Sequence, residues 1–376
     1  MSTKIIKIDI IAGVLYVLLT VVGLITLLFY SQANSLDSLL KQGLYFAPFS
    51  LMVVYAFVKK GNVDIFRKHE NLHYLISTIL LLVVLILGRE VLGAKRSINL
   101  IFFTFQPSYY TRIILISSLA IYIARYNDLI KENKLLLMVK KSYKFIIFTI
   151  LSALLILMEP HLSVLIITVA SLFLMLYLAN LDNKVVVIVV LVGLLILGGL
   201  FMFGHSYRSD RLKVYLKYCL LNPNRDEVVV TADQEMQIEE SLGALSAGGL
   251  WGTKSDFGSA ARNFVPEADT DYIFSFIGEE YGFVLSSIIV ALFFALFFRL
   301  YFLSWKIRDI YRRYLAIGLS FNFIFTVIVN IGVAISTLPS TGVSLPFISY
   351  GGSAFLMDSF SLAIILNIIG REGVAK

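Results

Sequence analysis

The sequence predicts an all-α polytopic membrane protein, in which about ten transmembrane helices form a single transmembrane domain over residues 1–376. Two observations lead to this fold class. The chain is 58% hydrophobic and only 15% charged, which is far more apolar than a soluble protein of this length needs. Its apolar residues also gather into runs long enough to cross a bilayer as helices, for which about 20 residues are required.

Ten apolar runs have about the length of a membrane span, and several lie near the lower limit of about 17 residues. These runs are residues 8–30, 42–58, 71–88, 110–126, 144–159, 161–180, 184–204, 281–304, 312–336 and 350–370. No small-residue cleavage site follows the first run, so it is interpreted as a retained span and not as a signal peptide.

Basic residues set the expected orientation of the spans. With the N-terminus inside, more than half of the 32 Lys and Arg residues fall in short cytoplasmic loops and tails, as the positive-inside rule requires. An even number of spans then places both termini in the cytoplasm. In a soluble protein the net charge of +7 would suggest nucleic acid, but this distribution explains the charge without such a partner. Cys219 is the single cysteine, so an intrachain disulfide is excluded.

Residues 205–280 form the one long segment between spans, and the predicted topology makes this segment an extracytoplasmic loop. It carries 13 of the 25 acidic residues. A loop of this length in a compact protein is usually functional or disordered. Its interior favours function, because 234–245 has helical spacing of apolar residues and 246–249 contains a helix-stop and turn signal.

A second irregular region, residues 338–353, precedes the last span. It contains two prolines and a cluster of glycines, which cannot continue a helix. Irregular backbone at membrane depth is tolerated only where it is buried in protein or lines a wet cavity. The sequence therefore predicts a re-entrant Gly/Pro segment that forms one wall of an outward-facing pocket.

Five carboxylates lie within residues 263–280, at the foot of an apolar segment. Asp271 directly precedes the apolar residues that begin the span, so it would be partly dehydrated and usable as a general base. Glu267 and Thr270 are polar neighbours that would orient it. The alternative is that these residues only cap the N-terminus of the following helix, as Asp and Thr often do.

The same run resembles the signature of the SEDS family (shape, elongation, division and sporulation), the FtsW/RodA/SpoVE type of peptidoglycan polymerase. Residues 264–274 and the pair Glu279-Glu280 match it, with Asp269 in place of a usual His and Tyr272 in place of Phe. The last Asp of the signature is the family's catalytic carboxylate, and it corresponds to Asp271.

The region before the last span is also similar to this family. The matching residues are Asn330, Gly332, Leu338, Pro339, Thr341, Gly342 and 345–353, and only Ser344 departs from the pattern. A simple connection rich in Gly and Pro would not predict the Ser-Tyr-Gly-Gly-Ser run that stands here. The resemblance implies that Ser349, Tyr350 and Ser353 contribute to substrate binding.

Further matches concern basic residues expected on the outer side. Residues 93–99 and 105–108 resemble the family's outer loop after the third span, which implies substrate binding by Gln106 and Ser108. Lys95 and Arg96 are either interfacial anchors or, with the resemblance, groups that hold a lipid pyrophosphate. The same two interpretations apply to Arg208 and Arg211, which follow the seventh run.

Three more positions complete the comparison with the family. Residues 237–249 resemble a family segment in which Gln stands where this chain has Glu240. His161 occupies a position where the family often has Asp, and is either a plain interfacial histidine or functional. Asp358 lies in the middle of the last predicted span, where a carboxylate is either functional or held in a buried pair.

The resemblance implies a reaction, a location and partners. The reaction is glycosyl transfer with inversion, in which lipid II (undecaprenyl-pyrophosphate-linked disaccharide-peptide) is polymerised into glycan strands and polyprenyl pyrophosphate leaves. A divalent cation, Mg²⁺ or Mn²⁺, is a candidate cofactor, and no nucleotide or organic cofactor is expected. The implied location is the bacterial cytoplasmic membrane, among membrane lipids, with a class B penicillin-binding transpeptidase as partner. The motifs lean toward the FtsW/SpoVE branch.

Two other functions remain open at this stage. The same pocket would suit a lipid II flippase or transporter, since polar groups and broken helices within a membrane fit transport as well. A non-enzymatic scaffold for division proteins is the third possibility. Asp271 distinguishes them, because a polymerase needs its carboxylate, a flippase would tolerate Asn with modest loss, and a scaffold would be insensitive to changes in the pocket.

Overall fold

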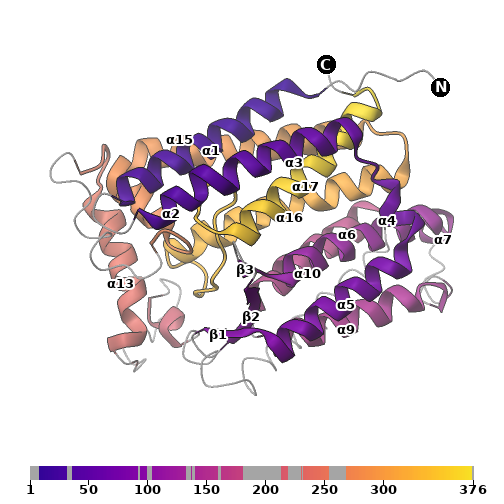
Figure 1. Ribbon diagram of the computed structural model, residues 1–376, viewed down its shortest axis with the longest axis horizontal. Helices are drawn as coiled ribbons and strands as arrows, with labels where there is room; N and C mark the ends of the chain where they lie inside the picture. Colours follow the sequence, from indigo (N-terminus) through magenta and orange to yellow (C-terminus); the bar gives the residue numbers. More distant parts are fainter. Residues whose placement is uncertain are drawn as a thin grey trace.

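The computed structural model describes residues 8–31, 36–91, 94–99, 104–132, 137, 140–159, 162–180, 213–218, 230, 232–253 and 268–374. Long helices lie side by side along one direction and form the body of the molecule (Figure 1). The start of α1 (Ile10–Ser31) and the end of α17 (Gly352–Arg371) lie at one end of this bundle, and the helix α13 (Ala232–Ala247) lies toward the opposite end.

The helices with the clearest membrane character are long and apolar. Among the described residues, six helical stretches are long and apolar enough to cross a membrane: Ile10–Tyr30, Asp37–Lys60, Glu70–Leu87, Ile273–Trp305, Ile310–Ala334 and Gly352–Arg371. They correspond to α1 (Ile10–Ser31), the continuous α2 (Asp37–Leu40), η1 (Lys41–Phe46) and α3 (Ala47–Lys60), then α5 (Glu70–Leu87), α15 (Ile273–Trp305), α16 (Ile310–Ala334) and α17 (Gly352–Arg371). The chain is therefore a multi-pass membrane protein.

Three further helices match predicted runs but are shorter or more polar. They are α6 (Pro107–Arg125), α9 (Tyr143–Met158) and α10 (Leu162–Leu178). The run 184–204 lies outside the described residues, and the short α4 (Asp64–Lys68) and α7 (Asn127–Lys131) lie toward the end that holds the termini. Helix α6 is buried along most of its length against α16, α10 and α5, which lets it carry polar side chains that lipid would not tolerate.

The all-α prediction omits a small antiparallel sheet between α5 and α6. Strand β1 (Arg89–Val91) pairs with β2 (Ala94–Asn99), and β2 pairs with β3 (Thr104–Phe105), with Ile98 opposite Phe105. These strands are short and lack a long alternating pattern, so the sequence did not reveal them. The sheet leads directly into α6, whose first residue is Pro107. Arg96 lies in its central strand, β2.

The segment from Ile335 to Gly351, called here the 335–351 segment, contains no helix or strand and folds back along the bundle. Phe347 packs edge-on against Tyr16 in α1, with 4.9 Å between ring centroids, and stacks on Phe323 in α16 at 5.5 Å. Gly23 of α1 permits this approach, because a Cβ there would lie 2.7 Å from the Cα of Ile348. The segment is thus packed into the protein interior.

The described part of the 205–280 segment confirms the predicted helix 234–245 as part of α13. Helix α15 begins at Ile273, so residues 273–280 at the end of this segment are helical. A break at Gly282, where φ is 74° and ψ is 180°, divides α15 into two parts. Gly248, after α13, lies directly on the first part: a Cβ there would be 2.0 Å from the carbonyl oxygen of Gly278.

Candidate active site

The turn that carries Asp271 is held by hydrogen bonds from the 335–351 segment. The backbone amide of Tyr350 donates to the carbonyl oxygen of Asp269 at 2.8 Å. The Ser349 hydroxyl donates to the carbonyl oxygen of Thr270 at 2.6 Å and accepts from the amide of Leu345 at 2.7 Å. The backbone on both sides of this turn is therefore fixed by residues that lie far away in the sequence.

Asn330 of α16 fixes the next carbonyl of the turn. Its Nδ2 donates to the carbonyl oxygen of Asp271 at 2.8 Å and to that of Val343 at 2.7 Å. Asn330 is 1% exposed, so this amide joins the turn to the 335–351 segment in an environment shielded from solvent. Three successive carbonyls, those of residues 269 to 271, are thereby held in place, and the direction of the Asp271 side chain is restricted.

The Asp271 carboxylate and the Arg96 guanidinium face the same glycine. A Cβ added to Gly342 would lie 3.3 Å from Asp271 Oδ2 and 3.6 Å from Arg96 Nη1. Gly342 has a φ of +67°, a conformation that residues with a Cβ rarely adopt. The glycine leaves space at the point where a carboxylate and a cation meet, and both side chains are partly exposed.

Asp269 occupies a separate position from Asp271. Its Oδ2 accepts a hydrogen bond of 2.7 Å from the Ser38 hydroxyl of α2. Tyr272 is the N-cap residue of α15, and its side chain makes no capping hydrogen bond. Asp271 directly precedes this residue.

Ser353 joins the start of α17 to the start of α6. Its hydroxyl accepts from the amide of Gln106 at 2.9 Å and donates to the carbonyl oxygen of Thr104 at 2.5 Å. Ser108, two residues after Gln106, is fully buried. These predicted substrate-binding residues lie at the same end of the bundle as Asp271, where the hydroxyls of Ser349 and Ser353 bond to backbone groups.

Several predicted site residues cannot be placed with the others. Arg208, Arg211, Glu267 and His161 lie outside the described residues. Lys95 is described only as part of the backbone of β2, where it is opposite Glu90. Of the expected site, the structure brings Asp271 and Arg96 together at Gly342, joins Ser349 to Thr270, and separately joins Ser353 to Gln106.

A buried ion pair lies near this site and was not predicted as a pair. Arg112 of α6 and Asp358 of α17 are bonded through Nη2 and Oδ1, with side chains only 2% and 7% exposed. The Arg112 guanidinium also lies over the ring of Tyr109, at 4.9 Å from its centroid. Asp358 was noted as a carboxylate within a span; Arg112 carries the same signal, a charge in the apolar run 110–126.

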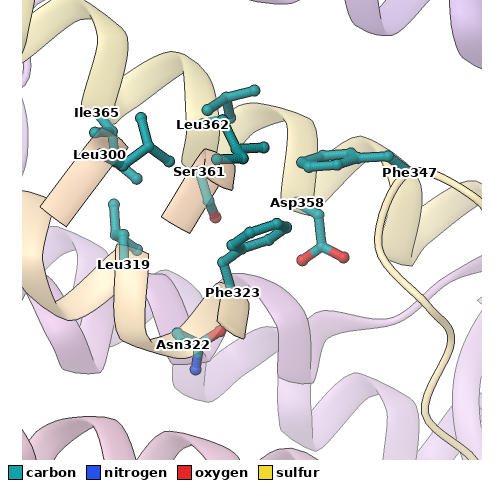
Figure 2. Close-up of a pocket in the computed structure, with 10 residues that line it drawn as sticks. Leu300, Leu319, Asn322, Phe323, Phe347, Asp358, Ser361, Leu362 and Ile365 are labelled. Atoms are coloured by element: carbon teal, nitrogen blue, oxygen red, sulfur yellow. The ribbon is translucent and has the colours of Figure 1, made fainter. Parts of the chain in front are cut away.

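Asp358 also lines a small pocket, and Asp271 is not among the residues that line it. Figure 2 labels Asp358, Phe323 and Phe347 among the side chains that line this pocket. The remaining lining residues are mainly leucines and isoleucine, together with Asn322 and Ser361. The cavity is enclosed by α15, α16, α17 and the 335–351 segment.

A metal centre needs several ligating side chains close together. Within the described ranges no group of three or more His, Cys, Asp or Glu side chains is arranged to hold an ion. Near Gly342 the one carboxylate is that of Asp271, as far as the described part of the chain extends. These side chains alone do not build a metal site.

Comparison with known proteins gives consistent similarities over nearly the whole chain. The profile of the cell cycle protein family FtsW/RodA/SpoVE matches residues 6–372. A probable peptidoglycan glycosyltransferase FtsW of Haemophilus influenzae is 30% identical over 365 residues, which is 94% of this chain and 88% of the relative. Stage V sporulation protein E of Bacillus subtilis is 29% identical over 379 residues and covers 98% of both chains.

Two solved structures share the fold. One, described as showing the structural coordination of polymerization and crosslinking by a peptidoglycan synthase complex, aligns with a TM-score of 0.74 at 22% identity, over 97% of this chain and 98% of the other. The rod shape determining protein RodA of Thermus thermophilus aligns with a TM-score of 0.67 at 21% identity, over 97% of both chains.

Proposed function

Because the chain belongs to the FtsW/RodA/SpoVE family, we propose that it is a peptidoglycan glycosyltransferase that polymerises lipid II at the site around Asp271. The observation that carries this proposal is the meeting of the Asp271 carboxylate and the Arg96 guanidinium at Gly342. A glycosyl transfer from a pyrophosphate donor needs a base for the acceptor and a cation for the leaving group, and this arrangement offers one of each.

Asp271 acts as the general base. Its carboxylate takes the proton of the acceptor sugar's 4-hydroxyl while that oxygen attacks the anomeric carbon of the donor. The new C–O bond forms on the face opposite the leaving group, so the configuration inverts. The bond from the anomeric carbon to the pyrophosphate oxygen breaks, and polyprenyl pyrophosphate leaves with the electron pair. Unlike a glycoside hydrolase, the enzyme needs no acid, because pyrophosphate is already a good leaving group.

Arg96 is proposed to hold the pyrophosphate. A guanidinium presents several N–H donors in a plane that matches phosphate oxygens, and its charge is permanent. Arg96 lies on β2, close to Asp271, and does not belong to the turn that carries Asp271. Lys95, Arg208 and Arg211 are further candidates for the same task.

A divalent ion remains a proposal. Mg²⁺ is commonly bound by one or two carboxylates together with substrate phosphates. Asp271 supplies one such carboxylate, so Mg²⁺ or Mn²⁺ would be held largely by the pyrophosphate, whose negative charge it would neutralise. No step above depends on it.

The membrane arrangement proposed for this enzyme has ten spans, with both termini in the cytoplasm and the 205–280 segment outside. The start of α1 and the end of α17 lie at the end of the bundle away from α13, which supports this orientation (Figure 1). The 335–351 segment would then be re-entrant from the outer side, as its packing against Tyr16 and Phe323 supports. The reaction would take place at the outer surface of the inner membrane.

A transpeptidase is the proposed partner. The solved structure with the same fold is described as a peptidoglycan synthase complex that coordinates polymerization and crosslinking. We propose that this chain likewise works with a class B penicillin-binding transpeptidase.

The experiment that tests the function is polymerisation of lipid II by the purified protein with its cognate transpeptidase in detergent micelles. Micelles have no two compartments, so transport cannot produce a signal. We expect glycan polymer from the wild type and none from a folded, partner-binding Asp271→Asn variant. Equal polymer from both would remove Asp271 from this role and direct attention to Glu267 or Asp269. No polymer from either would favour a transporter or scaffold.

A further inference from the structure

Gly342, which borders both Asp271 and Arg96, has a backbone conformation that the glycine itself does not fix. Its φ of +67° is open to glycine without a steric penalty, but glycine adopts many other conformations as readily. Among the described residues, Gly342 takes part in no hydrogen bond. The conformation of this glycine must therefore be set by the residues on either side of it.

The carbonyls of both neighbours of Gly342 accept hydrogen bonds from helix side chains. Asn330 Nδ2 of α16 donates to the carbonyl oxygen of Val343 at 2.7 Å. The Ser163 hydroxyl of α10 donates to the carbonyl oxygen of Thr341 at 2.5 Å. The Thr341 carbonyl belongs to the same planar peptide unit as the Gly342 nitrogen, so the bond from Ser163 restricts rotation about the φ angle of Gly342.

Thr341 depends on Ser163 for its orientation. As far as the structure describes the chain, the bond to Ser163 is the one hydrogen bond that Thr341 makes, because its own hydroxyl is buried and has no partner there. Without Ser163, the peptide unit before Gly342 would lose this restraint, and its carbonyl would lack a partner.

Ser163 also differs from the other serine and threonine of α10. Thr168 and Ser171 donate to carbonyls one turn earlier in the same helix, at 2.6 and 2.8 Å, as hydroxyls within helices commonly do. Ser163 is the second residue of α10 and is only 5% exposed. Its hydroxyl joins α10 to the 335–351 segment, which the other two do not.

The start of α10 is itself held firmly. Val164, the residue after Ser163, is 1% exposed and packs in one apolar cluster with Tyr109 of α6 and Ala354 of α17. Three helices thus meet where the Ser163 hydroxyl begins. This packing makes Ser163 a fixed point from which the Thr341 carbonyl can be held.

We propose that Ser163 is a positioning residue that holds Gly342 in its left-handed conformation and so preserves the space that Asp271 and Arg96 border. This inference rests on the proposed function. Reacting groups must approach to about 3–3.5 Å, so a small change at Gly342 slows bond formation. Binding of the lipid substrate also involves the rest of that molecule, and it should change less.

The test measures kcat for lipid II polymerisation, the lipid II concentration at half-maximal rate, and thermal unfolding. For each mole of folded Ser163→Ala enzyme, kcat should fall about three- to ten-fold, while the half-saturating concentration should stay within about two-fold. Ser163→Thr, which keeps the hydroxyl, should restore most of the rate. A merely structural serine would change the folded fraction and leave kcat per folded enzyme unaltered.

Ser171→Ala is the matched control, because it makes the same change on the same helix. Ser171 is fully buried, and its hydroxyl donates to the Ile167 carbonyl within α10. Its kcat should stay within about two-fold of the wild type. Should Ser163→Ala not fold, Ser163→Cys keeps the size of the side chain and has only a weak donor.

A double variant tests whether Ser163 acts through Gly342. If it does, adding Ser163→Ala to Gly342→Ala should slow the enzyme by less than about two-fold beyond Gly342→Ala alone, because the conformation is already lost. If Ser163 acts elsewhere, the two losses should multiply.

Three results would overturn the inference and leave the proposed function intact. They are a wild-type kcat in folded Ser163→Ala or Ser163→Cys, a Ser163→Thr enzyme as slow as Ser163→Ala, and losses that multiply in the double variant. Absence of polymer from the wild type, or full activity of Asp271→Asn, would instead refute the proposed function.

Discussion

Asp271 lies so close to Gly342 that a Cβ added to this glycine would be 3.3 Å from the carboxylate oxygen Oδ2. The glycine belongs to the 335–351 segment and the carboxylate to the turn before α15, so two distant parts of the chain meet here. The same Cβ would be 3.6 Å from Arg96 Nη1. Because Gly342 has no side chain, it leaves a space that both the Asp271 carboxylate and the Arg96 guanidinium border.

Gly342→Ala should impair polymerisation strongly, although it adds only one methyl group. The left-handed conformation costs a residue with a Cβ roughly 1–2 kcal/mol. The methyl group would also press on the Asp271 carboxylate, and displacing a catalytic group slightly reduces the rate by about ten- to hundred-fold. Polymerisation rate and thermal unfolding of the purified variant check this expectation.

Gly13→Ala is the control for that substitution. Gly13 lies within α1, and a Cβ there would have no atom within 4 Å. It should leave polymerisation unchanged and stabilise the helix by up to about 1 kcal/mol. Equal rates for the two alanine variants would contradict the role assigned to the space at Gly342.

Asn330→Leu should reduce both stability and activity. It keeps a similar volume but removes the amide that donates to the carbonyls of Asp271 and Val343. Loss of these bonds should lower the free energy of unfolding by about 1–3 kcal/mol. Because the turn that carries Asp271 is then less restricted, the polymerisation rate should fall further than the loss of stability explains.

Asn322→Leu is the matched comparison on the same helix. Asn322 is also buried, and its Nδ2 makes one long hydrogen bond of 3.4 Å to Ser171 Oγ. This variant should be destabilised less and should keep its activity. If both leucine variants lost activity to the same extent, Asn330 would have no special relation to Asp271.

The apolar part of the fold could be predicted from sequence because lipid-crossing helices leave a local signal. The helix around Met236, Leu242 and Leu245 also followed from spacing alone. The predicted apolar run begins at residue 281, whereas α15 begins at Ile273, because charged Glu279 and Glu280 interrupt the apolar pattern while the first part of the helix continues through them. Local pattern therefore gave the helices more reliably than their ends.

The site itself was only partly predictable. The family motifs identified Asp271 and the segment that holds it. Pairings between distant residues, such as Arg112 with Asp358 or Ser38 with Asp269, leave no mark on a single sequence. Arg96 could be named as a cation, but its position beside Gly342 depends on a sheet whose strands are too short to be recognised by alternation.

Glu240→Gln should make the protein more stable at neutral pH and not at acidic pH. Burial, and then the charge of Glu239, raises the pKa of Glu240 above its usual value. The folded state therefore binds this proton more tightly than the unfolded state. The contribution of Glu240 to stability is fully present below its pKa in the unfolded state, about 4.3, and is lost as the pH rises through its pKa in the folded state. Glutamine removes that loss, so the unfolding temperature should rise at pH 7.5 and change little at pH 4.

Glu235→Gln provides the contrast on the same helix. Glu235 is paired with Lys217, so the same substitution there should lower the unfolding temperature at pH 7.5. A shift of equal sign for both variants, or a Glu240→Gln effect that does not depend on pH, would show that burial does not control the charge of Glu240.

The central claim is that Asp271, and not a neighbouring acid, is the base. The most direct measurement compares lipid II polymerisation by Asp271→Asn and Asp269→Asn, which make the same change two residues apart. We expect a loss of at least about 100-fold for Asp271→Asn, as for removal of a general base. We expect less than about ten-fold for Asp269→Asn, because asparagine can still accept the hydrogen bond from Ser38. Equal losses, or a greater loss at Asp269, would contradict the account.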